Sequence, residues 1–134
     1  MMSTRELEEY KSYYENGQIR VDCHYLNGEM HGDYKCYYEN GQVRVDCHHL
    51  NGKRHGEYKF YYEDGELRVH GYYLGGKIHG EYESYDRDGQ LMIHGYYVNG
   101  INITDELVKE YDLSDLCEED KLAITLKWGI RCLL

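Results

Sequence analysis

The chain of 134 residues repeats itself every 24 residues, and this internal repeat constrains the fold more than any other feature. The turn glycines return in phase in four successive units, as does the Tyr at the head of each unit. A fixed period of this length is typical of proteins built from stacked supersecondary units. The units begin at Tyr13, Tyr37, Tyr61 and Tyr85, and their glycines are Gly17, Gly41, Gly65 and Gly89, with a second set at Gly28, Gly52, Gly76 and Gly100.

Each unit contains two short runs of β-branched and aromatic residues separated by Asn-Gly or Asp-Gly. This pattern predicts a β-hairpin, because both turn residues tolerate the positive φ of a type I′ turn. We expect antiparallel strands at Tyr10–Tyr14 and Gln18–Leu26, joined by a two-residue turn, with a four-residue loop at Asn27–Met30 before the next unit. The predicted fold class is mainly β: a single-layer, elongated antiparallel β-meander of about eight strands with a C-terminal helical cap.

Opposite charges predict the register of this sheet. Lys35 is expected to lie between Asp22 and Asp46, and in later units the acid becomes His70 while the base becomes Glu83. This exchange is what pairing of opposite charges across strands requires. The complete ladder is Lys11, Asp22, Lys35, Asp46, Lys59, His70, Glu83 and His94.

Strict alternation along the strands then assigns residues to faces. One face should carry Ile19, Val21, Cys23 and Tyr25. The ladder's face should place an Arg beside a Tyr in each of the first three units, with the guanidinium over the ring. Tyr offers a large amphipathic contact area at low entropic cost, so this face is the candidate protein-binding surface. Its residues are Tyr13, Tyr37, Tyr61, Arg20, Arg44 and Arg68.

The repeat stops after Ile101, and the sequence that follows predicts two helices. We expect residues 1–9 to form a lead-in, residues 10–101 the hairpin repeats and residues 102–134 the helical cap. Thr104 and Ser114 are the expected N-caps of the two helices. An apolar stripe at near-helical spacing either covers the Tyr82–Val98 hairpin or forms a dimerisation face, so a homo-oligomer stays open. The stripe consists of Leu122, Leu126, Ile130 and Leu133.

The net charge of −10 narrows the class of partner. It disfavours nucleic acid and anionic membrane surfaces, which would repel the chain, and it favours a basic protein partner. No apolar run is long enough to cross a membrane, and the first residues do not form a secretory signal. We therefore expect an intracellular, reducing location in which the five Cys are free thiols.

Cys, His and Asp gather at residues 22–24 and 46–49, and all three are zinc ligands. Cys23 and Cys47 would lie two strands apart, about 9–10 Å, which is too far for one ion. His31, His55 and His79 recur in three successive units, which indicates turn packing rather than catalysis. We predict no metal site, no cofactor and no enzymatic activity.

The units YYENGQVR, YLNGEMHG and HLNGKRHGEYKFYYEDG resemble MORN repeats over roughly Tyr10–Gly100. They are most similar to the variant repeat of bacterial antitoxin-like proteins, which also multiplies in giant DNA viruses. The helical tail resembles those of giant-virus repeat proteins, which would allow a location in the virion. The resemblance implies a binding or scaffold module. Phosphoinositide binding, attributed to some MORN proteins, is disfavoured here by the charge.

Two functions therefore remain open. The first is a protein-interaction or scaffold module that binds through a Tyr-rich sheet face. The second is an antitoxin or immunity protein whose acidic surface masks a basic toxin.

Overall fold

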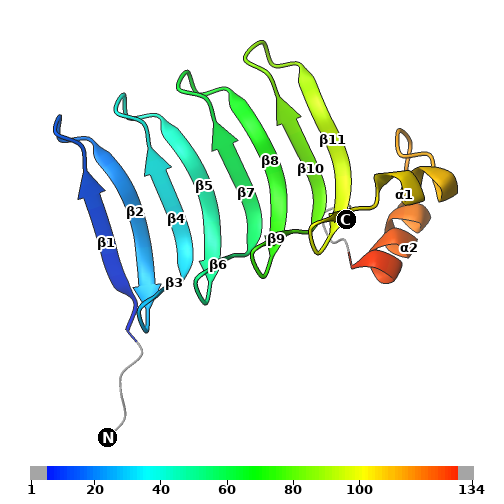
Figure 1. The fold of residues 1–134 in the computed structure, drawn as a ribbon, viewed down its shortest axis with the longest axis horizontal. Coiled ribbons are helices and arrows are strands. Elements are labelled where there is room, and N and C mark those ends of the chain that lie inside the picture. The colour runs from blue at the N-terminus through cyan, green and yellow to red at the C-terminus, as the bar shows by residue number, and fades with distance from the viewer. Residues whose placement is uncertain (1–5, 130–134) are drawn as a thin grey trace, which may run out of the picture.

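The computed structural model describes residues 6–129. It contains one open antiparallel sheet in which successive hairpins lie side by side in sequence order, as predicted (Figure 1). Eight long strands form the hairpins, and four strands of two residues each flank the turns at one end. The long strands are β1 (Glu8–Tyr13), β2 (Ile19–Leu26), β4 (Gly32–Tyr37), β5 (Val43–Leu50), β7 (Gly56–Tyr61), β8 (Leu67–Leu74), β10 (Gly80–Tyr85) and β11 (Leu91–Val98). The short strands are β3 (Glu29–Met30), β6 (Lys53–Arg54), β9 (Lys77–Ile78) and β12 (Ile101–Asn102).

The tip of each hairpin is a three-residue loop rather than the expected type I′ turn. In the first hairpin the Gly17 amide donates to the Tyr14 carbonyl, and the Tyr14 amide donates to the Gln18 carbonyl. Gly17 takes a φ of 85°, whereas Asn16 stays outside the left-handed region. This is a type I turn closed by a glycine bulge. The Asn16 side chain accepts a hydrogen bond from the Gln18 amide at 3.0 Å.

The type I′ turns lie at the opposite ends of the hairpins. Asn27 and Gly28 have φ angles of 53° and 81°, and β2 pairs with β3 across them. The loop therefore contains two residues rather than the four that we expected. The pairing then shifts by two residues, so Asp22 still meets Lys35 as predicted.

The charge ladder is confirmed at every step of the sheet. Lys35 lies between Asp22 and Asp46. Glu83 likewise lies between His70 and His94. A slip of one residue would move each strand's ladder side chains to the other face, so the charges help to fix the register.

A β-bulge near each hairpin tip exchanges the faces of two neighbouring residues. In the first hairpin Ser12 pairs with Val21 but Tyr13 pairs with Ile19, so Arg20 is passed over. Ile19 therefore joins Tyr13 on the ladder's face. Arg20 turns to the opposite face, where its Nε donates to Ser12 Oγ at 3.3 Å. The same shift recurs in the other three hairpins.

We call the side of the sheet that carries Lys35 and Asp46 the ladder face, and the side that carries Cys23, Phe60 and the bulge arginines the arginine face. The prediction that Arg and the first Tyr of each unit share a face is wrong, because strict alternation does not allow for the extra residue of a bulge. Ile19 was assigned to the wrong face for the same reason. The bulge arginines are Arg20, Arg44 and Arg68.

The sheet is a single layer, so its core consists of side chains that cover one another on the arginine face. Cys23 and Tyr58 are buried there. Rings of neighbouring strands meet edge to face, as for Tyr58 and Tyr73, whose centroids lie 5.2 Å apart. Gly71 is part of this layer, because a Cβ there would lie 2.9 Å from the Tyr82 ring.

Side chains at one hairpin tip bond to the backbone of the next hairpin. The Tyr14 hydroxyl donates to the Tyr37 carbonyl at 2.6 Å, and Asn16 Nδ2 donates to the Glu39 carbonyl at 2.9 Å. These bonds repeat with the period of the sequence, so they hold adjacent units in register. The equivalent donors are Tyr38, Tyr62 and Asn40.

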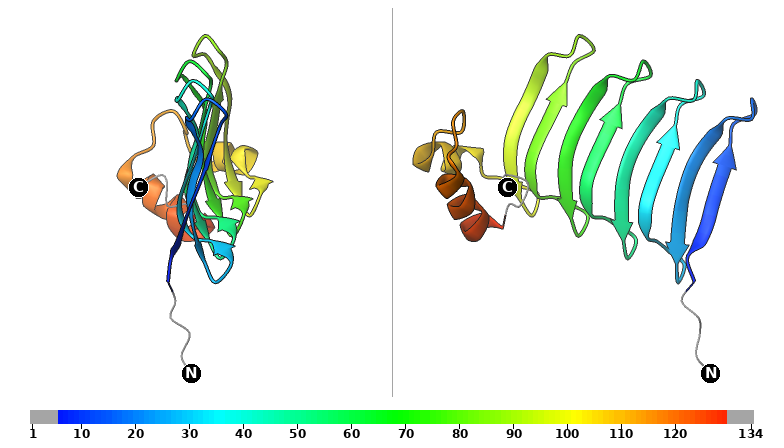
Figure 2. Two further views of the ribbon diagram at one scale, coloured as in Figure 1. Left: turned by 90° about the vertical axis from the view of Figure 1, so that its left-hand side faces the viewer. Right: turned by 180° about the vertical axis from the view of Figure 1, so that it is seen from behind.

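Two helices, α1 (Thr104–Glu110) and α2 (Glu118–Trp128), follow the sheet and lie at its C-terminal end (Figure 2). They pack against the last hairpin of their own chain, as predicted. No helix among residues 6–129 is long and apolar enough to span a membrane. The buried members of the tail cluster are Tyr96, Ile103, Leu107 and Ile124.

The apolar face of α2 differs from the predicted stripe. Leu122 and Leu126 are 50% and 78% exposed, whereas Ile124 is fully buried. Ile130 and Leu133, the other members of that stripe, lie outside the described residues.

The predicted N-caps are also wrong, since neither helix has a side-chain cap. The Thr104 hydroxyl accepts a bond from the Tyr96 amide at 2.9 Å, which ties α1 to β11. The Ser114 hydroxyl donates to Asp112 Oδ1 at 2.6 Å within the loop between the helices.

Candidate functional site

The arginine face carries a row of guanidinium groups alternating with aromatic rings. The guanidinium carbon of Arg44 lies 6.0 Å from the Phe60 ring centre, and that of Arg68 lies 5.0 Å from it. Arg44 also lies 5.8 Å from the Tyr38 ring, and Arg68 lies 5.2 Å from the Tyr62 ring. Phe60, the single Phe of the chain, is therefore flanked by two cations. Cation–π contacts of this kind hold the arginines over the sheet while leaving donors for a ligand.

Two titratable groups among the strands of this face stay neutral at neutral pH, whereas the carboxylate of Glu63 at a hairpin tip acts on the Tyr38 ring. Burial raises the pKa of Tyr34 to about 12 and that of Cys47 to about 11, so both stay neutral. Burial lowers the pKa of His49. Among the described strand positions paired on this face, Glu8 at the N-terminal edge is the one carboxylate. An acidic chain thus presents a face whose strand charges are mainly arginines.

The Tyr residues of the predicted binding surface lie on the ladder face instead. Tyr13 is 57% exposed, whereas Tyr37 and Tyr61 are half-buried. Tyr85, their equivalent in the last unit, donates to Glu83 of the ladder. The six predicted residues are therefore divided between the two faces, with the arginines beside a different set of rings.

One cluster on the ladder face has the composition of a metal site. Glu81, Glu83 and His94 each place a ligand atom within 4.8 Å of the other two, and they form the one such group among residues 6–129. Burial, then the hydrogen bond and charge of Glu83, raise the pKa of Glu81. Hydrogen bonds from Glu81 and Tyr85 lower the pKa of Glu83.

The metal-ligand candidates in the sequence were instead the Cys, His and Asp residues at 22–24 and 46–49. Cys23, Cys36, Cys47 and Cys117 are free thiols, as predicted. Cys132 lies outside the described residues. The carboxylate cluster was overlooked, although the predicted register already placed Glu83 opposite His94. The signal that could have found it is the change from Lys to Glu at this ladder position.

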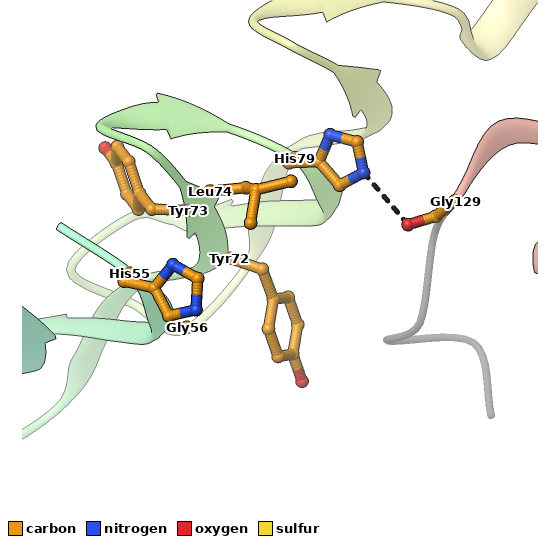
Figure 3. Close-up of a pocket in the computed structure, with 7 residues that line it drawn as sticks. All are labelled: His55, Gly56, Tyr72, Tyr73, Leu74, His79 and Gly129. Atoms are coloured by element: carbon orange, nitrogen blue, oxygen red, sulfur yellow. Dashed lines mark hydrogen bonds between the residues drawn. The ribbon is translucent and has the colours of Figure 1, made fainter. Parts of the chain in front are cut away.

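The repeated His residues lie beside the turns and bond there through their backbone amides. The His31 amide donates to the His24 carbonyl at 2.9 Å, and the same bond recurs at the equivalent residues of the next two units. His79 also holds the tail, because its Nε2 lies 2.9 Å from the Gly129 carbonyl (Figure 3). A half-open cavity of about 540 Å³ lies beside this contact, lined by His55, Gly56, Tyr72, Tyr73, Leu74, His79 and Gly129.

The family profile described as MORN repeat variant matches residues 9–27, 30–51, 54–74 and 78–99. Each match covers most of one hairpin, and together they cover more than half of the chain. The chain belongs to the MORN-repeat family. The comparison with curated proteins found no match. MORN repeats generally mediate protein or membrane interactions and are generally not enzymes. The inter-hairpin bonds of Tyr14 and Asn16 give a structural role to two recurrent positions of the repeat here.

Proposed function

We propose that this MORN-repeat chain is a non-enzymatic scaffold module that binds a protein partner through its arginine face. The row Arg44, Phe60 and Arg68 is the observation that carries the proposal. Arg and aromatic residues are enriched among residues that dominate binding energy at protein interfaces. The tail helices lie at the last hairpin, which leaves the earlier hairpins open to a partner (Figure 1).

The charge of this face favours an acidic segment rather than the basic partner suggested by the net charge. Arg44 and Arg68 are exposed, and their planar guanidinium groups can each bind a carboxylate through two hydrogen bonds. Partner side chains that alternate acidic and apolar groups would match the alternation of guanidinium and ring. Electrostatic complementarity would mainly set the specificity and the association rate.

The alternative is an antitoxin that neutralises a basic toxin through the ladder face. On that face all three acids of the ladder are paired with Lys or His. The other acids of the long strands on this face each lie 3.7 Å or less from a Lys or His, which further reduces the negative potential available to a partner; they are Glu9, Asp33, Glu57 and Glu81. The arginine face is therefore the better-supported site.

Selection of peptides from a random display library on the full chain tests the proposal. We expect acidic peptides with apolar residues, and Arg44→Ser and Arg68→Ser should each weaken binding by roughly 30-fold or more, the effect of a hot-spot residue. Lys35→Ser and Lys59→Ser on the ladder face are matched controls and should leave the affinity unchanged.

Two results would overturn the proposal. Basic peptides whose binding survives both Arg substitutions would favour the antitoxin alternative. Binding to vesicles containing phosphatidylserine, with no peptide selected, would replace the protein partner with a membrane surface.

A further inference from the structure

Two carboxylates and one imidazole converge on the ladder face of the last hairpin. Glu81 and Glu83 lie two residues apart on β10, so their side chains point to one face, and His94 of β11 is paired with Glu83. His94 Nε2 lies 3.3 Å from Glu81 Oε1 and 3.8 Å from Glu83 Oε1. The three side chains are between 24% and 35% exposed, so an ion can reach them from solvent.

The preceding hairpin provides an internal comparison, because Glu57, Lys59 and His70 occupy the same three positions. Lys59 Nζ lies 3.7 Å from Glu57, and His70 Nε2 lies 2.9 Å from the same carboxylate. That hairpin therefore supplies its own cation. In the last hairpin Glu83 replaces the lysine, which removes an ammonium group and adds a second carboxylate.

We propose that Glu81, Glu83 and His94 bind one divalent transition-metal ion, with Zn²⁺ as the ion that fits best. Zinc is held by His nitrogen at about 2.0–2.1 Å and by carboxylate oxygen at about 2.0–2.2 Å. Tetrahedral coordination at those lengths separates ligand atoms by about 3.3–3.6 Å. The two separations from His94 are already close to this range, so small side-chain rotations would complete the site. An imidazole ligand favours Zn²⁺ over Mg²⁺ or Ca²⁺.

Binding at this position would join β10 to β11 at the end of the array. Glu81 also lines a cleft with the loop between the two helices, so the site lies where the sheet meets the tail. An ion that binds only the folded chain stabilises it by mass action. Metal binding is therefore expected to raise the melting temperature of the full chain.

Cobalt is the probe for the experiment, because its visible spectrum distinguishes nitrogen and oxygen ligands from thiolates. The full chain should bind one Co²⁺ with d–d bands and without the near-ultraviolet thiolate band, and Zn²⁺ should displace it. Glu83→Lys recreates the triad of the preceding hairpin, so it should fold and yet lose affinity by roughly 10–100-fold or more. Lys59→Glu should conversely create a second site of the same type.

A measurement on the unmodified chain makes the test independent of folding of the variants. Co²⁺ should shift the ring signals of His94 in the NMR spectrum and leave those of His24 unchanged. The proposal is overturned if no Co²⁺ binds, if a thiolate band accompanies binding, or if Glu83→Lys retains full affinity. Failure of Lys59→Glu to gain a second site would also overturn it, since the three side chains would then be insufficient.

Discussion

The inner hairpins and the last hairpin of the sheet differ most clearly in the groups at their tips. In the second hairpin Tyr38 and Asn40 both donate hydrogen bonds to the backbone of the next hairpin. The last hairpin has Asp86 and Asp88 at these positions. Asp86 Oδ1 accepts bonds from backbone amides of its own turn, at 2.9 Å each.

This difference shows that the recurrent side chains of a repeat act largely on the next repeat. At the last tip a hydroxyl or amide donor would have no following hairpin whose carbonyl it could bind. Asp86 stands there instead and accepts hydrogen bonds from its own turn. The lost inter-hairpin contacts are compensated by the tail, which packs on Tyr96 of β11. The array is thus stabilised by contacts between adjacent hairpins along its length and by the helical cap at its C-terminal end.

The largest loss of stability is expected when the packing of the tail helices on the sheet is disrupted. Ile124→Ala should lower the free energy of unfolding by about 2–5 kcal/mol, because the side chain is fully buried between the tail and the sheet. Hydrogen exchange should accelerate first in β10 and β11. Leu126→Ala, at a 78% exposed position of the same helix, is the matched control and should change stability by less than about 0.5 kcal/mol.

Removing one bond between inner hairpins should have a smaller effect. Tyr38→Phe deletes the hydroxyl that donates to the Tyr61 carbonyl and should cost about 0.5–1.5 kcal/mol in chemical denaturation. Tyr13→Phe removes an exposed hydroxyl and should be neutral. Equal effects of the two substitutions would contradict the role assigned to the second Tyr of each unit.

A substitution can also add a hydrogen bond between adjacent hairpins, and only where another hairpin follows. Asp64 occupies the position of Asn40 but has no donor, so Asp64→Asn should gain a bond to the next hairpin worth about 0.5 kcal/mol. Asp88→Asn should gain nothing, because no hairpin follows it. A similar gain at both sites would mean that the benefit arises within the turn itself.

The stability contributions of Glu57 in the third hairpin and of Glu81 in the last hairpin should depend on pH in opposite directions. A hydrogen bond with His70 lowers the pKa of Glu57 below its ordinary value of 4.5, so its contribution to stability is present above pH 4.5 and lost as the pH falls through the lowered pKa. Burial raises the pKa of Glu81, so its contribution is present below pH 4.5 and lost as the pH rises through the raised pKa.

At neutral pH and without metal, Glu57→Gln should therefore destabilise the chain, whereas Glu81→Gln should stabilise it slightly. Both differences from the unmodified protein should shrink below pH 4.5 in denaturation measurements. Shifts of the same sign for the two variants would contradict the assigned environments.

The register of the sheet was predictable from sequence. The Lys and Asp of the early ladder positions become Glu and His in the later ones, and one pairing of the strands keeps opposite charges together throughout. The bulge was not predictable, since Ile19, Arg20 and Val21 show the alternation of a regular strand. In the structure the bulge is evident because the six residues of β1 pair with the seven residues Ile19–Tyr25 of β2. The candidate surface was divided between two faces for this reason alone.

The tail illustrates a different limit. Leu122 and Leu126 have helical spacing, but Ile124 and Trp128 have the same spacing and are the pair that packs on the sheet. Which pair is buried depends on the path of the loop between α1 and α2, which periodicity does not encode. The Thr104 hydroxyl bonds to a strand amide instead of capping its helix because the helix begins beside β11.

We propose that the bulge arginines, and not the ladder lysines, bind the partner. The most direct measurement follows the side-chain Nε–Hε signals of Arg44 and Arg68 by NMR while a selected acidic peptide is added to the full chain. We expect both signals to shift and saturate with the peptide while the side-chain signals of Lys35 and Lys59 do not move. Shifts at the lysines with unchanged arginine signals would contradict the proposal.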